Sequence, residues 1–70
     1  MAENIYKVEE IVGSSGNGLE DAIKGAIARA GKTLRNLDWF EVAEIRGHIR
    51  DGQVAHYQVK LKVGFRLEDK

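Results

Sequence analysis

The sequence predicts an α+β fold with the element order β-α-β-β, in which a three-stranded antiparallel sheet carries one helix on one face. Three observations predict it. The chain opens with a segment whose alternation is typical of a strand, and it continues with a stripe of apolar residues at helical spacing. It ends with two long strand-like runs around an Asp-Gly dipeptide. We treat residues 1–70 as a single domain, because 70 residues are too few for two cores.

The first predicted strand covers the segment NIYKVEEIVGSS, whose residues alternate between two faces. One face carries Tyr6, Val8, Glu10 and Val12, and the other carries Ile5, Lys7, Glu9 and Ile11. The glycine-rich segment GSSGNG, residues 13–18, then interrupts the strand. Such a loop before a helix can bind phosphate through backbone N–H groups, but its spacing matches neither a dinucleotide motif nor a P-loop. We therefore expect a strand-to-helix turn.

The helix predicted from Leu19 has the strongest pattern in the chain. Apolar residues recur at spacings of three and four, at Leu19, Ala22, Ile23, Ala26, Ile27, Ala30 and Leu34. Acidic residues lie in its first turn and basic residues near its end, as the helix dipole favours. Because Gly25 and Gly31 weaken a helix, we expect another backbone to approach closely there.

The two remaining runs, 39–49 and 54–67, flank Asp51 and Gly52, which favour the two-residue turn of a β-hairpin. If pairing continues from that turn without interruption, Phe40 faces the core and Trp39 faces the other, uncovered side. The predicted core face carries Phe40, Val42, Glu44, Arg46, His48, Ala55, Tyr57, Val59, Leu61 and Val63. The uncovered face carries Trp39, Glu41, Ala43, Ile45, Gly47, Ile49, Val54, His56, Gln58, Lys60 and Lys62. A bulge in either strand would reverse the faces beyond it.

Composition restricts the classes of function. Eleven basic and eleven acidic residues give zero formal net charge, which argues against nucleic-acid binding. The chain has no cysteine, and Ser14, Ser15 and Thr33 lack recognisable acid-base partners, so we expect no catalytic residues and no enzyme. The N-terminal segment does not resemble a signal peptide, and no apolar run is long enough to span a bilayer, so we expect a cytoplasmic protein without a membrane partner.

Trp39 and Gln58 form the first candidate site, because the predicted register places both on the uncovered face. An indole offers a flat surface for an aromatic ligand, and an amide offers a donor and an acceptor for a heterocycle. The alternative is that Trp39 packs under a neighbouring subunit and Gln58 is a solvated strand residue. Arg46, Arg50 and Arg66 are weaker candidates for binding phosphate.

The two histidines, His48 and His56, form a second candidate pair. The predicted register places them on opposite faces of the hairpin, so we expect no shared metal or acid-base site within one chain. We interpret them as surface or interface residues.

The segments KTLRNLDWFEV, EIRGHI, HYQV and LKVGFRLE make the chain resemble the dodecins, a family of small flavin-binding proteins. The resemblance covers Ile5 to Glu68, in the same order of elements. It implies a hollow homododecamer in which two flavins stack between two tryptophans of symmetry-related subunits. By position, Trp39 would be the stacking residue, Gln58 would hydrogen-bond the isoalloxazine ring, and Asp38 would lie near the pocket.

The resemblance also implies ligands and a function. Arg46 and Arg66 match arginines that in some bacterial dodecins contact phosphate-bearing ligands, including coenzyme A. The implied flavin is FMN or riboflavin, and the implied function is flavin storage or sequestration with quenching of its photochemistry, without catalysis. A flavin-dependent electron-transfer protein or oxidoreductase and a purely structural cage remain as alternatives. One departure is Leu19, where many dodecins have a tryptophan.

Overall fold

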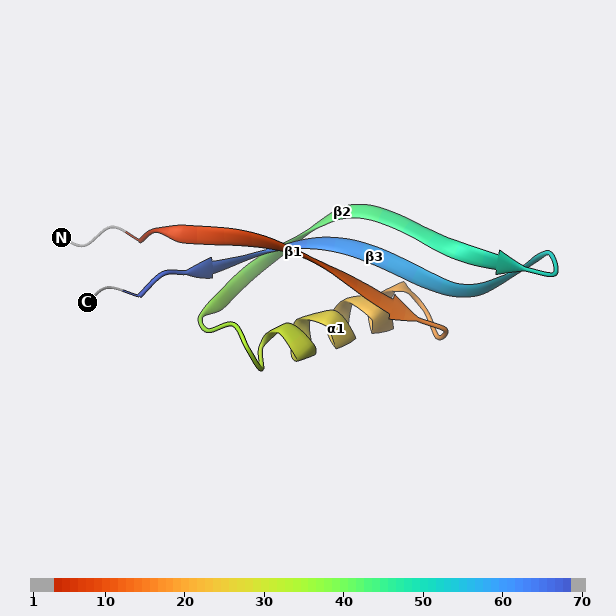
Figure 1. Ribbon diagram of the computed structural model, residues 1–70, viewed down its shortest axis with the longest axis horizontal. Coiled ribbons are helices and arrows are strands. Elements are labelled where there is room, and N and C mark those ends of the chain that lie inside the picture. The colour runs from red at the N-terminus through yellow and green to blue at the C-terminus, as the bar shows by residue number, and fades with distance from the viewer. Residues whose placement is uncertain (1–3, 69–70) are drawn as a thin grey trace.

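The computed structural model describes residues 4–68, which form a three-stranded sheet with one helix on one face (Figure 1). The elements are β1 (Tyr6–Ser15), α1 (Leu19–Ala30), β2 (Leu37–Arg50) and β3 (Gln53–Arg66). The strand order is β1-β3-β2, and both pairings are antiparallel. The predicted α+β class and β-α-β-β order are confirmed. In the described part of the chain, no helix has the length and apolar character needed to cross a membrane.

The central strand, β3, supplies most of the core. Val59, Leu61 and Val63 alternate along it and are at most 1% exposed, as the sequence predicted. Ala22 of α1 is also 1% exposed. Partly buried apolar residues pack around this cluster, namely Ile11, Leu19, Ile23, Ala26 and Ile27. The core is therefore one layer of side chains between α1 and the two strands β1 and β3.

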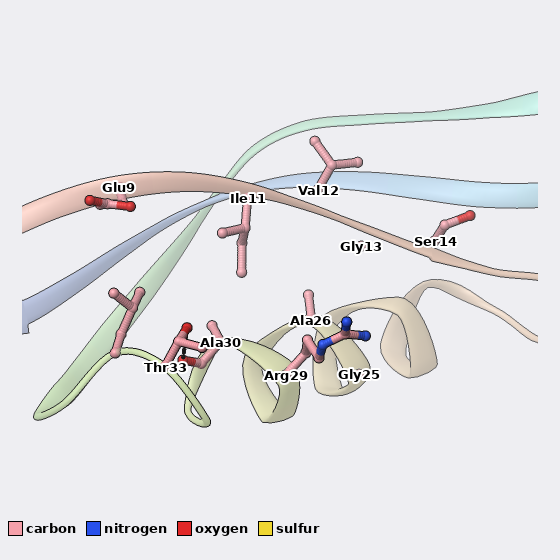
Figure 2. A pocket seen from close by; sticks show the side chains of 11 residues that line it. Glu9, Ile11, Val12, Gly13, Ser14, Gly25, Ala26, Arg29, Ala30 and Thr33 are labelled. Carbon is pink, nitrogen blue, oxygen red and sulfur yellow. Dashed lines mark hydrogen bonds between the residues drawn. The ribbon is translucent and has the colours of Figure 1, made fainter.

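Gly13 allows α1 to lie close to β1, in the region that Figure 2 shows. A Cβ atom at Gly13 would collide with the carbonyl oxygen of Ala22 and would lie 2.9 Å from the Cβ of Ala26. At Gly25, where the sequence led us to expect a close approach, a Cβ would meet nothing within 4 Å. That expectation was wrong, and the close contact is made from the strand instead.

The helix ends earlier than its apolar stripe. α1 stops at Ala30, and the chain continues through a turn in which the Leu34 N–H donates to the Ala30 carbonyl at 2.8 Å. Leu34, the last residue of the predicted stripe, therefore lies outside the helix.

α1 covers only part of the sheet. Across residues 4–68 its backbone lies close to β1 and β3 but not to β2. Phe40 points to the helix side, because it pairs with Val63, and it borders a groove with Ile23 and Ile27. Phe40 is nevertheless 47% exposed. Its predicted burial was wrong, because β2 is an edge strand that the 12-residue helix does not reach.

The chain is long and thin, with principal extents of 57 × 20 × 13 Å. Its radius of gyration is 14.7 Å, whereas a compact domain of this length has about 11 Å. Large apolar side chains are exposed along the edge strands, at Val8, Val12, Phe40, Val42, Ile45 and Ile49 among others. Exposed apolar surface of this extent is typical of chains that associate.

The hairpin turn follows the prediction. Asp51 and Gly52 have φ values of 53° and 75°, as a type I′ turn requires, and Arg50 pairs with Gln53. The predicted uninterrupted pairing was wrong, because the register then shifts three times. The shifts lie between His48 and Ile49, between Val42 and Glu44, and between Leu37 and Trp39.

Compared with the predicted faces, those of β2 are reversed from Glu44 to the turn. Ala55 is the extra residue at the first shift and Ala43 the extra residue at the second. The residues that move from the predicted core face to the uncovered face are Glu44, Arg46 and His48, and those that move the opposite way are Ile45, Gly47 and Ile49. The two shifts act in opposite directions, so from Val42 to Trp39 the pairing with β3 is again the predicted one. Trp39 therefore pairs with Gly64 and keeps its predicted face.

The contrast between Gly13 and Gly25 can be tested by alanine substitution. Gly13→Ala forces α1 away from β1 and should lower the free energy of unfolding by about 1–3 kcal/mol. Gly25→Ala, the matched control, should raise it by up to about 1 kcal/mol, because alanine favours the helix and meets no neighbour. Denaturant unfolding at one fixed chain concentration measures both. Equal effects of the two substitutions would contradict the close approach at Gly13.

Candidate functional site

Trp39 lies on the uncovered face of the sheet, directly over Gly64. The two residues are Cα partners, and a Cβ atom at Gly64 would collide with three atoms of the indole. From β1, Tyr6 meets the indole edge-on, with ring centroids 5.1 Å apart and planes inclined by 62°. Trp39 remains 43% exposed. The strand and Tyr6 therefore fix the indole while part of it stays accessible.

Two other predicted site residues lie beside Trp39. Arg66 is the Cα partner of Tyr6, and its backbone forms two hydrogen bonds with Asn36. The Asn36 carbonyl accepts from the Arg66 N–H at 3.1 Å, and the Asn36 amide donates to the Arg66 carbonyl at 3.2 Å. Asp38 is the unpaired residue at the register shift before Trp39. We define the tryptophan cluster as Tyr6, Asp38, Trp39, Gly64 and Arg66.

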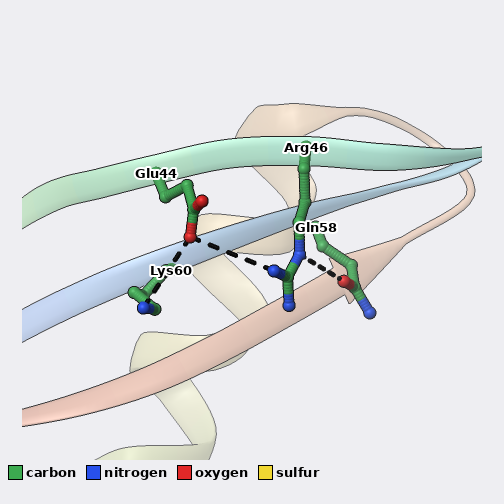
Figure 3. Close-up of polar contacts among 4 residues, drawn as sticks. All are labelled: Glu44, Arg46, Gln58 and Lys60. Carbon is green, nitrogen blue, oxygen red and sulfur yellow. Dashed lines mark hydrogen bonds and ion pairs between the residues drawn. The ribbon is translucent and has the colours of Figure 1, made fainter.

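Gln58 belongs to a second group of polar residues on the same face. Arg46 is its Cα partner, and the Arg46 Nε donates to the Gln58 Oε1 at 3.0 Å (Figure 3). Glu44 Oε1 lies 4.0 Å from an Arg46 nitrogen and 3.7 Å from the Lys60 Nζ. Because the amide oxygen accepts from Arg46, the amide is oriented and its NH₂ group is directed elsewhere as a donor. We define these four residues as the glutamine cluster.

The two clusters lie far apart within one chain. Gly64, under the indole, and Gln58 are six residues apart in β3, a distance of about 20 Å along a strand. Trp39 and Gln58 thus share a face, as predicted, but one chain does not bring them together. A ligand that contacts both must receive them from different copies of the chain, or span the whole distance.

The histidines do come together, and their predicted placement on opposite faces was wrong. His48 and His56 are Cα partners, with ring centroids 4.7 Å apart and planes inclined by 50°. The register shift at Ala55 is the cause, because uninterrupted pairing would place His48 opposite Ala55. Within residues 4–68, no group of three or more His, Cys, Asp or Glu side chains is placed to hold a metal ion.

The Ser15 side chain closes the glycine-rich loop before α1 with two hydrogen bonds. The Ser15 hydroxyl donates to the Asp21 carboxylate at 2.7 Å and accepts from the Asn17 N–H at 2.9 Å. A carboxylate therefore lies beside the first turn of α1, where a bound phosphate would be repelled. The loop is a strand-to-helix turn, as the sequence predicted.

The sequence analysis missed Tyr6 and Gly64. A glycine inside a strand pattern is a signal that another group approaches closely, and Gly64 carried that signal. An aromatic residue on the neighbouring strand could then have been paired with the indole. That step required the pairing of β1 with β3, which joins the two ends of the chain and leaves no local mark.

These features define a small α+β chain whose candidate binding surface is the open face of its sheet. The family model described as Dodecin matches residues 5–68, and the chain belongs to the dodecin family. A protein named Dodecin from Thermus thermophilus is 63% identical over 65 residues, which are 93% of this chain and 94% of that protein.

Solved structures agree with this assignment. Dodecin from Streptomyces davaonensis has a TM-score of 0.93 at 54% identity, over 97% of this chain and 100% of that one. Dodecin from Streptomyces coelicolor has a TM-score of 0.93 at 56% identity and covers both chains completely. A calcium dodecin from Mycobacterium tuberculosis is more distant, with a TM-score of 0.79 at 28% identity over 94% of each chain.

Replacing Gly64 tests how the indole is held. Gly64→Ala places a methyl group where the indole lies, so it should displace Trp39, abolish its near-ultraviolet circular dichroism and lower stability by about 1–3 kcal/mol. Gly16→Ala is the control, because a Cβ there makes only an ordinary contact, 3.8 Å from the Ala55 carbonyl oxygen. An unchanged near-ultraviolet spectrum in Gly64→Ala would contradict the described packing.

Proposed function

We propose that this protein binds flavin by stacking the isoalloxazine ring on Trp39, and that it stores or sequesters the flavin and quenches its photochemistry. The observation that carries the proposal is the held indole. Trp39 lies over Gly64, contacts Tyr6 and is 43% exposed on an uncovered face. A fixed and accessible aromatic surface suits the stacking of a flat heterocycle. Indole is also an electron donor, which accounts for quenching of a stacked flavin.

Variants of a relative support the choice of residues. Solved structures of Thermus thermophilus dodecin include one variant with a tryptophan replaced by phenylalanine and two with an arginine replaced by alanine. Along that chain the three substituted positions are separated by the same intervals as Trp39, Arg46 and Arg66. We assign these three residues to the flavin site, together with Asp38 and Gln58.

The proposed site requires an assembly. Trp39 and Gln58 are about 20 Å apart in one chain, so the stacking and hydrogen-bonding groups for one flavin come from different copies. Two copies that bring their indoles face to face would hold two flavins in the order Trp, flavin, flavin, Trp. A homododecamer, as the family resemblance implies, is the assembly we propose. The elongated shape and the exposed apolar residues of β2 support association.

The arginines bear on which flavin binds. Arg66 lies in the tryptophan cluster and Arg46 in the glutamine cluster, so the two could reach a ligand from different copies. If either contacts the phosphate of FMN, FMN should bind more tightly than riboflavin, and added salt should reduce the difference. Coenzyme A binding stays a prediction of the resemblance.

A fluorescence titration tests the proposal directly. Apoprotein titrated into riboflavin, and separately into FMN, should quench flavin emission and saturate near one flavin per chain. Trp39→Ala should lose both affinity and quenching, because the stacking surface is gone. Trp39→Phe should keep part of the affinity but quench less. Lys32→Ala, an exposed polar position in the turn after α1 and outside both clusters, is the control and should behave as the original protein.

The outcome also separates the alternative functions. Light scattering must first show that each variant assembles as the original protein does. Normal assembly without any flavin quenching would leave a structural cage. Sustained anaerobic oxidation of NAD(P)H by the flavin-loaded protein would instead identify a flavin-dependent oxidoreductase.

Mixed assemblies test whether one flavin is bound between chains. Trp39→Ala and Gln58→Ala chains should each bind flavin weakly when assembled alone. When the two are unfolded together and reassembled, some sites receive an intact Trp39 from one chain and an intact Gln58 from another. These mixtures should bind more flavin than the average of the two parent variants. Binding equal to that average would place both groups of a site on the same chain.

A further inference from the structure

The paired histidines at the end of the hairpin form a group outside the proposed flavin site. His48 and His56 face each other across β2 and β3, on the uncovered side of the sheet. His48 is exposed and His56 is half-buried. Their rings are 4.7 Å apart between centroids. In β2, His48 is ten residues from Asp38. The histidine pair is therefore separate from the tryptophan cluster.

The spacing of the rings suits a shared metal ion. Two imidazoles bound to one ion at about 2.0–2.1 Å, with an angle of about 90–110° between them, place their ring centroids roughly 4.5–5.2 Å apart. The observed 4.7 Å falls within this interval. The rings are inclined by 50° rather than stacked in parallel, so a nitrogen from each can be turned toward one point by rotation about the side-chain bonds.

The surroundings leave room for the ion. β1 ends at Ser15, opposite Tyr57, so His56 lies beyond the end of β1 and the hairpin projects as two strands (Figure 1). Two cations flank His48 on the same face of β2, Arg46 and Arg50, each two residues away. The Arg46 guanidinium contacts Gln58 and Glu44, which lie on the side of Arg46 away from His48, so this charge is drawn away from the pair.

We infer that His48 and His56 form a two-ligand site for a divalent transition-metal ion such as Zn²⁺ or Cu²⁺, in which water or groups from another copy complete the coordination. Neutral imidazole is a good ligand for these ions, whereas Ca²⁺ and Mg²⁺ take oxygen ligands. The register shift at Ala55 supports the inference, because bulges often redirect side chains at binding sites and this one creates the pair.

Calorimetric titration of the untagged, assembled protein with ZnCl₂ tests the site, with MgCl₂ as the parallel probe. The original protein should bind about one Zn²⁺ per chain and no Mg²⁺. His48→Gln and His56→Gln should each weaken Zn²⁺ binding at least about tenfold, because a single imidazole loses the chelate advantage. Gln53→Ala, at the same end of the hairpin, is the matched control and should leave Zn²⁺ binding unchanged.

A second measurement does not depend on the variants. Electron paramagnetic resonance of Cu²⁺ added to the original protein should show nitrogen couplings from two imidazoles. Two results would overturn the inference: Zn²⁺ affinity that both histidine substitutions leave unchanged, or a Cu²⁺ spectrum without imidazole nitrogen. Neither result bears on flavin binding, which the titrations with Trp39 variants address separately.

Discussion

The positions of the polar side chains on the open face depend on two bulges that shift the pairing of β2 with β3 in opposite directions. Ala55 adds a residue to β3, and Ala43 adds one to β2, so the register changes over the segment between them and then returns. A one-residue shift moves every side chain of a strand to the other face. Within that segment the shift pairs Arg46 with Gln58 and also brings the histidines together. Beyond it, the original register places the indole of Trp39 over a glycine.

Local patterns were enough to predict the elements but not the bulges. The helical stripe, the Asp-Gly turn and the alternation of Val59, Leu61 and Val63 each depend on neighbours in the sequence. The helix, the turn and the buried strand that they predict are all present, although the helix ends at Ala30. Hydrophobic patterning specifies register only where one face of a strand is buried. Every residue of β2 after Leu37 is exposed, so burial did not distinguish its two faces. Ile45 could be assigned to either one.

The sequence predicted that Trp39 lies on the uncovered face, but it did not predict the residues that contact the indole. The predicted register placed Trp39 on the uncovered face, because adjacent residues of a strand point to opposite faces and Phe40 was assigned to the core. The residues that hold it, Tyr6 and Gly64, became visible only when the pairing of β1 with β3 joined opposite ends of the chain. The burial of Phe40 also depended on contacts between elements that the sequence pattern does not show. Its face was predicted correctly, but its burial depended on how far a 12-residue helix extends across the sheet.

The exposure that leaves β2 ambiguous in the sequence is also the feature on which the proposed assembly depends. One helix covers β1 and β3, and the apolar residues of β2 remain for another protein surface to cover. The same face holds the tryptophan cluster near one end and the glutamine cluster about 20 Å away. In the proposed assembly, contacts between copies that bury the apolar edge also bring an indole from one chain toward an amide from another. Stability and ligand binding then depend on the same contacts, and neither is complete in a single chain.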